Sequence, residues 1–397
     1  MPETLKRYYL EPSRFEGQAK VLDIREEKGS FIVVLDESLF YPEGGGQPCD
    51  LGSIGDIPLR SVTEKNGEIF HWLDGKPDFG TGELVPMHVD KTRRIDHSQQ
   101  HSAQHLLSAI LERKYGIHTV SFHLGLSYST IDVTAPTMDQ DMIRALEEEA
   151  ESFILREQAY VLHVCPPEDP KTFPFRKSLP EGEEEIRIIE IKEYDWVACC
   201  GTHVASAKDL RILSILQAEK YKGNTRLYFV AGARAAELLR RRKDSLVAIA
   251  ASLGTSPEDA FAKVDALKAR NAILETDRAT LMRENARLEV ALRALASSSG
   301  NSRPLSFMFD DKSAEAAFET VKAGANGGYS TIAFSSPDKT VCIMVPQARS
   351  AGLIQRLKVL LGEHGGRGGG GGNNFRAMFE SIEAASTFFD AALALLE

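Results

Sequence analysis

The sequence predicts an α+β fold with four parts: an N-terminal β-barrel, an α+β domain, a long helical hairpin and a small C-terminal α/β domain. Three observations predict it. Residues 1–90 show short β-prone runs, residues 91–231 mix strand and helix patterns, and residues 232–297 are almost wholly helical in pattern. The length of 397 residues fits two to four domains.

Residues 1–90 are expected to form a small β-barrel or sandwich. Turn residues separate candidate strands at 19–24, 30–35, 61–62 and 68–72. Within this region the segment 40–48 reads FYPEGGGQP, which contains too many glycines for a strand interior. The segment is therefore expected to be a loop.

Residues 91–231 are expected to form the α+β domain. Asp96 can cap a helix with an apolar face that ends before Gly116. The segment 138–157 reads as a second, acidic amphipathic helix. Strands are expected at 120–124, 129–133, 186–191, 210–219 and 225–230.

Residues 232–297 predict two helices in a hairpin, interrupted at 253–259. In the second helix, leucine recurs every seven residues, as at the d position of a heptad: Leu267, Leu274, Leu281, Leu288 and Leu295. Two of the matching a positions are asparagine, Asn271 and Asn285. This pattern is typical of a two-stranded coiled coil and predicts a homodimer. The alternative is that these leucines pack against the chain's own first helix.

After a linker at 296–303, residues 303–397 predict a small α/β domain. Strands are expected at 305–309, 330–335 and 341–345, and a helix at 374–396. The run GGRGGGGG at 365–372 is expected to be a loop, either a cradle for phosphate or a flexible segment.

Composition favours a cytoplasmic protein. The five cysteines form an odd number without a ladder of spacings, which argues against a disulfide framework and for a reducing compartment. The N-terminus lacks a secretory pattern, and no apolar run approaches the roughly 20 residues of a membrane helix. Because the net charge is -10, binding of RNA would require a local cluster of Lys and Arg side chains.

Two separate histidine and cysteine patterns indicate a metal site. His97, His101 and His105 recur every four residues and therefore share one helical stripe. In the sequence CCGTH, Cys199 and His203 are also four residues apart. Thiolate and imidazole are the ligands that zinc prefers, so two such pairs in one domain predict a zinc site.

These motifs resemble those of a known family. Residues 93–107 resemble the HxxxH segment of the alanyl-tRNA synthetase editing domain, residues 199–204 its CGGTHV partner, and residues 41–48 its glycine-rich motif. The helical stretch and the polyglycine end resemble the synthetase's C-terminal extension, called DHHA1. Along nearly its whole length the chain is similar to long-form, free-standing alanyl-tRNA editing proteins of the AlaX type.

The resemblance implies a metal site. It assigns Zn2+ to His101, His105, Cys199 and His203, whereas spacing alone also allows His97 to pair with His101. Cys200 stands where the synthetase has glycine.

The resemblance also implies the activity and the partner. The implied activity is hydrolysis of tRNA(Ala) mischarged with serine, and also with glycine. A pocket that accepts alanine rejects a similar residue with an added hydroxyl only weakly, so a second, hydrolytic site is needed. The C-terminal domain is expected to bind the outer corner of the tRNA.

Further residues are implied to contact the substrate. The backbone of Gly44, Gly45 and Gly46, with Gln47, is expected over the editing pocket; a plain barrel turn is the alternative. Ser121, His123 and Thr130 are expected to line the same pocket as catalytic residues, with His123 orienting water or the ribose; a strand histidine satisfied by its neighbours is the alternative. Lys222 and Arg226 are expected to contact acceptor-stem phosphates, or to be a solvated hairpin tip.

Three other functions compete with this one. A zinc peptidase would place Glu beside the first histidine of the pair, and that Glu is absent. A DHH phosphoesterase would need an Asp-His-His core, but Asp96 and His97 are followed by Ser98. A non-catalytic tRNA-binding protein with structural zinc is the main alternative.

Overall fold

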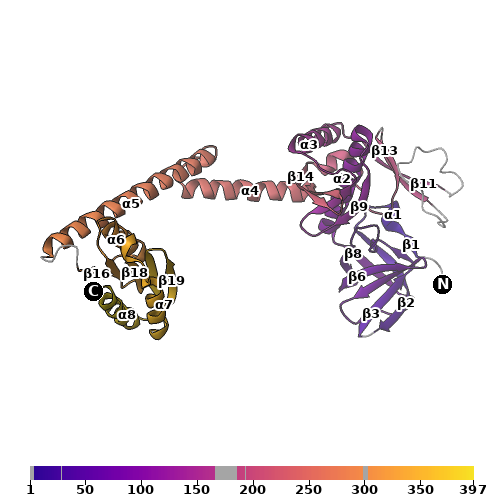
Figure 1. The fold of residues 1–397 in the computed structure, drawn as a ribbon. Helices are drawn as coiled ribbons and strands as arrows, with labels where there is room; N and C mark the ends of the chain where they lie inside the picture. The colour runs from indigo at the N-terminus through magenta and orange to yellow at the C-terminus, as the bar shows by residue number, and fades with distance from the viewer. Residues whose placement is uncertain (1–3, 28, 166–185, 193, 298–302) are drawn as a thin grey trace. The chain divides into compact units, whose positions relative to one another are not determined.

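A computed structural model describes residues 4–27, 29–165, 186–192, 194–297 and 303–397 (Figure 1). The chain divides into two compact units, Met1–Val247 and Ala248–Glu397. The mixed α+β character predicted from the sequence is confirmed. Within the described ranges, no helix combines the length and the apolar character needed to cross a bilayer.

The first unit begins with six strands that pair in a closed order, β2-β3-β7-β6-β5-β8, around an apolar core that includes Val33, Leu35, Val62 and Met87. Their bounds are β2 (Glu16–Glu27), β3 (Ser30–Leu35), β5 (Gly52–Ile54), β6 (Ile57–Lys65), β7 (Glu68–Leu73) and β8 (Leu84–Val89). A short parallel pair, β1 (Leu5–Lys6) and β4 (Glu37–Ser38), flanks the helical turn α1 (Arg7–Leu10). The segment at 40–48 is a loop between β4 and β5, as expected.

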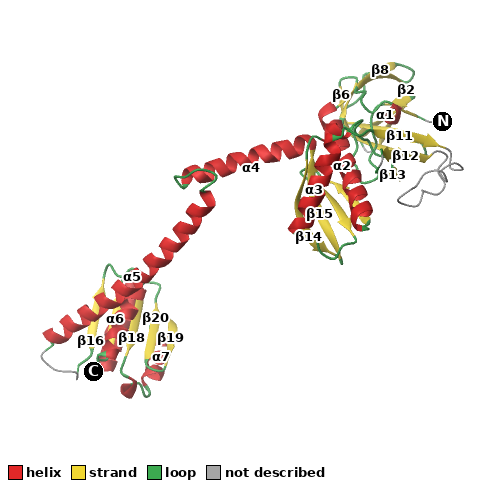
Figure 2. Cartoon of the chain, turned by 90° about the horizontal axis from the view of Figure 1, so that it is seen from above, coloured by secondary structure: helices red, strands yellow, loops and turns green. Residues whose placement is uncertain are grey.

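The rest of the first unit is a sheet covered by two helices (Figure 2). The sheet has the order β14-β15-β10-β9, and α2 and α3 lie over one face of it. A smaller sheet, β11-β12-β13, and the 3-10 helix η2 complete the unit. The bounds are α2 (Lys91–Tyr115), β9 (Thr119–Leu124), β10 (Ser129–Val133), α3 (Gln140–Leu155), β11 (Tyr160–Cys165), β12 (Ile186–Ile191), β13 (Asp195–Ala198), η2 (Ala207–Leu210), β14 (Leu213–Tyr221) and β15 (Asn224–Ala231).

Helix α2 begins earlier than the sequence predicts. Its N-cap is Asp90, whose carboxylate accepts a hydrogen bond from the backbone N–H of Arg93 at 3.0 Å, and not Asp96. The carboxylate of Asp96 instead binds Arg234. At the other end Gly116 takes the left-handed conformation with φ of 63°, as expected for a glycine stop.

A buried ion pair ties the barrel to α2. The guanidinium of Arg94 donates to the carboxylate of Asp50 and to the backbone oxygens of Leu39 and Pro12. Arg94 is 1% exposed and Asp50 is fully buried. Asp50 also accepts from the backbone N–H of Tyr41 at 2.7 Å, so Arg94 fixes both ends of the glycine-rich loop.

The predicted helical region consists of two helices, α4 (Gly232–Ser252) and α5 (Ala260–Ala296). Their pairing as a hairpin stays a prediction. In the second unit α5 packs against α6, and Ala286 and Val290 of α5 are buried, whereas all five leucines of the repeat are 44–84% exposed. The packing of the leucines against the chain's own first helix, or against a second copy, stays a prediction too. The linker predicted at 296–303 lies largely outside the described residues.

The second unit contains a five-stranded sheet in the order β16-β17-β18-β20-β19. Helix α6 packs on one face, and α7 and α8 contribute to an apolar cluster with strands β17, β18 and β20. The bounds are β16 (Leu305–Phe309), α6 (Ala314–Asn326), β17 (Thr331–Ser335), β18 (Thr340–Met344), η4 (Gln347–Arg349), α7 (Leu353–Glu363), β19 (Arg367–Gly371), β20 (Asn374–Met378) and α8 (Ile382–Leu396).

Two expectations about the second unit are wrong. The glycine run is not a loop, because its centre forms the edge strand β19, paired with β20. A side chain at Gly368 or Gly370 would collide with the backbone carbonyl of Arg376 or Asn374, so glycine permits the close approach of these two strands. The predicted helix at 374–396 is therefore split into β20 and α8.

Candidate metal centre

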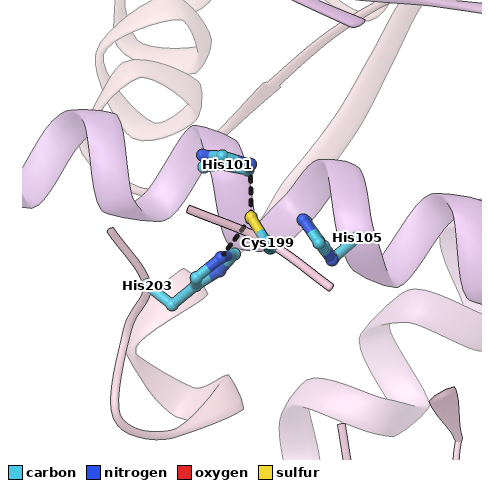
Figure 3. A group of neighbouring side chains, drawn as sticks. All are labelled: His101, His105, Cys199 and His203. Atoms are coloured by element: carbon cyan, nitrogen blue, oxygen red, sulfur yellow. Dashed lines mark hydrogen bonds between the residues drawn. The ribbon is translucent and has the colours of Figure 1, made fainter. Parts of the chain in front are cut away.

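Helix α2 supplies the first half of the site. His101 and His105 are four residues apart, and both side chains are almost fully buried. Their rings point to the same side of the helix, with centroids 5.1 Å apart (Figure 3). The predicted stripe of histidines therefore exists and faces the interior of the domain.

The segment after β13 supplies the second half. The Sγ atom of Cys199 lies 3.4 Å from Nε2 of His101 and 3.3 Å from Nε2 of His203 (Figure 3). One ligand atom from each of His101, His105, Cys199 and His203 lies within 4.8 Å of the others. The two halves, about a hundred residues apart in the chain, thus converge on one point.

The tight course of this segment depends on glycine and on an arginine. A side chain at Gly201 would collide with the imidazole of His101. Arg187, on β12, donates from Nη1 to the backbone oxygens of Cys199 at 2.9 Å and Gly201 at 2.6 Å. The backbone N–H of Gly201 donates to the sulfur of Cys199 at 3.3 Å. The arginine therefore holds the thiol and the glycine against α2.

Two polar side chains orient the imidazoles. Oε1 of Gln47 lies 2.8 Å from Nδ1 of His101 and also accepts from the backbone N–H of Thr202 at 3.1 Å. Because a carbonyl oxygen only accepts, Nδ1 of His101 carries the proton and Nε2 presents its lone pair to the cluster. Oγ of Ser102 lies 3.0 Å from Nδ1 of His203, which leaves Nε2 of that ring facing Cys199.

Burial shifts the pKa values of these groups in a direction that bears on metal binding. It lowers the pKa of His101 to about 3 and that of His203 well below its ordinary value, so both rings are neutral. Burial raises the pKa of the Cys199 thiol to about 11. Neutral imidazoles and a thiol that becomes a thiolate on binding are the donor types that suit zinc.

His97 and Cys200 lie outside this cluster. His97 is 2% exposed, and within the described part of the chain its Nδ1 has no hydrogen-bond partner. Cys200 is exposed. Of the alternatives that the spacing left open, the geometry selects His101 with His105, and Cys199 over Cys200.

The glycine-rich loop lies beside the cluster. Gly45 and Gly46 have φ values of 57° and 80°, which residues with a side chain rarely adopt. The backbone oxygen of Gly46 accepts from the N–H of Leu124 on β9 at 3.1 Å. Gly44 pairs with Gln47 in an isolated bridge, and Gln47 is 1% exposed. The loop thus reaches the centre through Gln47, whose contact with a candidate ligand the sequence did not indicate.

Ser121, His123 and Thr130 are not brought to the cluster. On β9 the ring of Phe122 lies 5.1 Å from that of His101, and side chains alternate along a strand, so Ser121 and His123 point to the opposite face. Thr130 is paired with His123 across β9 and β10 and shares that face. These three side chains therefore lie outside the cluster, and their contact with the substrate stays a prediction.

Lys222 and Arg226 flank the β14–β15 turn. The guanidinium of Arg226 donates to Asp132 at 2.6 and 2.9 Å and lies 3.5 Å from the centre of the Tyr221 ring. Nζ of Lys222 lies 5.1 Å from the same ring. Their contact with phosphate stays a prediction.

The sequence also missed Arg187 and Ser102 as supports of the site. Nothing in the sequence marks Arg187, because its function depends on β12 lying next to Cys199. Ser102 directly follows His101, yet its contact is with His203.

The chain is similar to known proteins along nearly its whole length. Residues 186–228 match the family model of the threonyl and alanyl tRNA synthetase second additional domain. The chain is 31% identical over 404 residues to the alanyl-tRNA editing protein AlaX-L of Pyrococcus horikoshii, with 97% of this chain and 96% of that protein covered. It is 33% identical over 263 residues to the alanyl-tRNA editing protein Aarsd1 of Mus musculus, with 66% of this chain and 63% of the mouse protein covered.

The domain match and the cluster of histidines and cysteine define a protein of the class that carries a synthetase-type additional domain. The extent of the match to AlaX-L shows the particular family: the chain belongs to the free-standing alanyl-tRNA editing proteins. It spans 62–63% of the length of the Aarsd1 proteins of Mus musculus and Xenopus laevis.

Proposed function

We propose that this protein is a zinc-dependent hydrolase that removes serine, and also glycine, from mischarged tRNA(Ala). The observation that carries the proposal is the convergence of three imidazoles and one thiol within 4.8 Å inside a domain of the alanyl-tRNA editing family. The names of AlaX-L and Aarsd1 give the alanyl-tRNA editing activity of those relatives and support the same substrate class here.

The chain's own residues would prepare this site for an ester substrate. A bound zinc ion polarises an ester carbonyl, holds a substrate amino group, or lowers the pKa of water. Gln47 and Ser102 fix the rings of His101 and His203, and Arg187 holds the loop that bears Cys199. The left-handed backbone of Gly45, with open space where a side chain would lie, leaves room for close approach of the substrate, whereas Gly46 packs against Phe122.

A second candidate is a non-catalytic tRNA-binding protein with a structural metal. One observation favours it: four protein ligands fill a tetrahedral zinc site, whereas catalytic sites keep one position open. For catalysis, one ligand must be displaced or zinc must become five-coordinate when substrate binds.

Deacylation assays separate the two functions. Purified protein is incubated with tRNA(Ala) charged with serine, glycine or alanine, with and without chelator. We expect hydrolysis of the seryl and glycyl esters, loss of activity with chelator, and loss in His105→Ala and Cys199→Ala. Cys200→Ala is the matched control, because that exposed thiol lies outside the cluster. Full activity after complete loss of zinc would remove the metal from the reaction.

The proposal extends to partners and location. A homodimer through α5 is supported by the exposure of Leu267, Leu274, Leu281, Leu288 and Leu295, which lie on one heptad position. The second unit is proposed to bind the outer corner of the tRNA. A cytoplasmic location fits Cys199 and Cys200, since a reducing compartment keeps thiols free for metal.

A further inference from the structure

The sheet β14-β15-β10-β9 has a second face, turned away from the metal centre. Residues paired across its strands place one set of side chains together there: Ser121, His123, Thr130, Asp132, Arg226 and Tyr228. On the other face Phe122, Ile131 and Phe229 belong to the apolar core that α2 and α3 share. The four strands thus separate an apolar face, which carries the helices, from a polar and aromatic face.

A pocket of about 360 Å³ opens on the polar face. Its lining includes His123, Leu126, Tyr128, Thr130 and Tyr228. Leu126 is 83% exposed and Tyr128 is 45% exposed, an unusual display of large apolar surface at one hairpin tip. The rings of Tyr128 and Tyr228 meet edge to face at 5.1 Å. The volume lies in the range of pockets that hold small ligands, and two aromatic rings offer a planar group a place to stack.

The charges around the pocket suit a phosphate backbone. Arg226 lines the pocket and is held in place by Asp132. Lys222 lies at the adjacent turn and is exposed. Glu219, the second acidic neighbour besides Asp132, accepts a hydrogen bond from the hydroxyl of Tyr228 at 2.6 Å and so fixes that ring. Aromatic rings interleaved with fixed cations are the combination that binds single-stranded nucleic acid.

Only β9, the edge strand of the sheet, separates the pocket from the metal centre. Phe122 contacts His101 on one side of this strand, and the next residue, His123, lines the pocket on the other. The backbone of Leu124 is joined to Gly46 of the glycine-rich loop. A flexible chain that crosses this one edge would reach from the pocket to the cluster.

We propose that this face binds the unpaired 3′-terminal nucleotides of the tRNA, with a nucleobase stacked against Tyr128 and Tyr228. The inference rests on the proposed function, because it names the part of that substrate which the face holds. The unpaired end is the segment that joins the acyl ester to the acceptor duplex, so it must lie near the metal centre during hydrolysis.

Binding of uncharged RNA to the full-length protein tests this inference without any need for hydrolysis. The probes are an acceptor-stem RNA hairpin with a four-nucleotide single-stranded 3′ tail and the same hairpin with a blunt end, titrated at one fixed salt concentration. Tyr128→Ala and Tyr228→Ala are compared with Tyr228→Phe, which keeps the ring, and with Leu155→Ala, which removes an exposed apolar side chain on α3.

We expect the two alanine variants to bind the tailed hairpin about five- to a hundred-fold more weakly than wild type, the loss of one stacked base. Leu155→Ala should bind as wild type, Tyr228→Phe should bind more tightly than Tyr228→Ala because it keeps the ring, and the blunt hairpin should bind all five proteins with one weak affinity. Equal affinity of wild type for the two hairpins, or unchanged affinity in both alanine variants, would overturn the inference and leave the face to a protein partner. Tail-dependent binding without deacylation would instead refute the proposed function alone.

Discussion

Replacement of Gln47 by leucine should weaken metal binding although Gln47 is not a candidate ligand. Its amide makes three buried contacts: with Nδ1 of His101 at 2.8 Å, with the N–H of Thr202 at 3.1 Å and with the hydroxyl of Thr202 at 3.0 Å. Leucine fills a similar volume but accepts no hydrogen bond. The proton on Nδ1 of His101 then loses its partner, and the ring is no longer held with Nε2 toward the cluster.

The size of the effect follows from these contacts. Two buried donors without partners cost about 1–3 kcal/mol each, so the free energy of unfolding of the first unit should fall by about 2–6 kcal/mol. Loss of a residue that supports a metal ligand lowers metal affinity by about 10- to 100-fold. Zinc affinity is measured by competition with a chromophoric chelator, and stability by chemical denaturation.

Two variants separate the effect on the metal from the effect on stability. In Gln47→Glu the carboxylate still accepts from His101 and Thr202, so zinc affinity should be retained. Gln100→Leu removes an equally buried amide, which exchanges two hydrogen bonds of 2.9 Å with Ala231, and should destabilise the protein without weakening zinc binding. An affinity of Gln47→Leu within twofold of wild type, or an equal loss in Gln100→Leu, would refute the reasoning.

Three more predictions follow from the site and from α5. Because burial raises the pKa of the Cys199 thiol to about 11 and lowers that of His101 to about 3, zinc should displace one proton between about pH 6 and 9. Zinc affinity should therefore rise about tenfold for each unit of increase in pH. Calorimetry in two buffers measures the number of protons released on zinc binding, and a value of zero or two would contradict this prediction. Gly201→Ala should abolish zinc binding, because the added Cβ would collide with His101. Gly369→Ala should not, because the added Cβ would lie in open space, and metal analysis of the two variants tests this. Leu288→Asp should convert a dimer to a monomer in sedimentation, and an unchanged mass argues against pairing through α5.

Local spacing predicts the part of the site that lies on regular structure. The interval of four residues between His101 and His105 fixes a common side of α2 wherever the helix begins, so the error at Asp96 does not affect it. The pair Cys199 and His203 is equally local. That the two pairs meet is a property of the tertiary structure. It could still be predicted, because imidazole and thiolate are the ligands that zinc prefers and one shared site accounts for both pairs.

The features that local sequence did not decide depend on long-range pairing. Ser121 and His123 lie in a strand as expected. The face that they occupy depends on which residue of β9 packs against α2, and that residue is Phe122, which lies between them. The glycine run reads as a loop by composition, because glycine disfavours strands. The run forms β19 because β20 lies so close that side chains at Gly368 and Gly370 would not fit. The distance between these two strands cannot be predicted from a local sequence pattern.

The ion pair between Arg94 and Asp50 limits how this protein can be divided. A boundary drawn at residue 90 looks like a natural place to separate the barrel from the metal-binding domain. Expression of the later part alone would remove Asp50, Leu39 and Pro12, which accept the hydrogen bonds of the Arg94 guanidinium, and would also discard Gln47. A minimal fragment intended to carry the candidate metal centre must therefore retain both halves, and any recombination between relatives must exchange them as a single block.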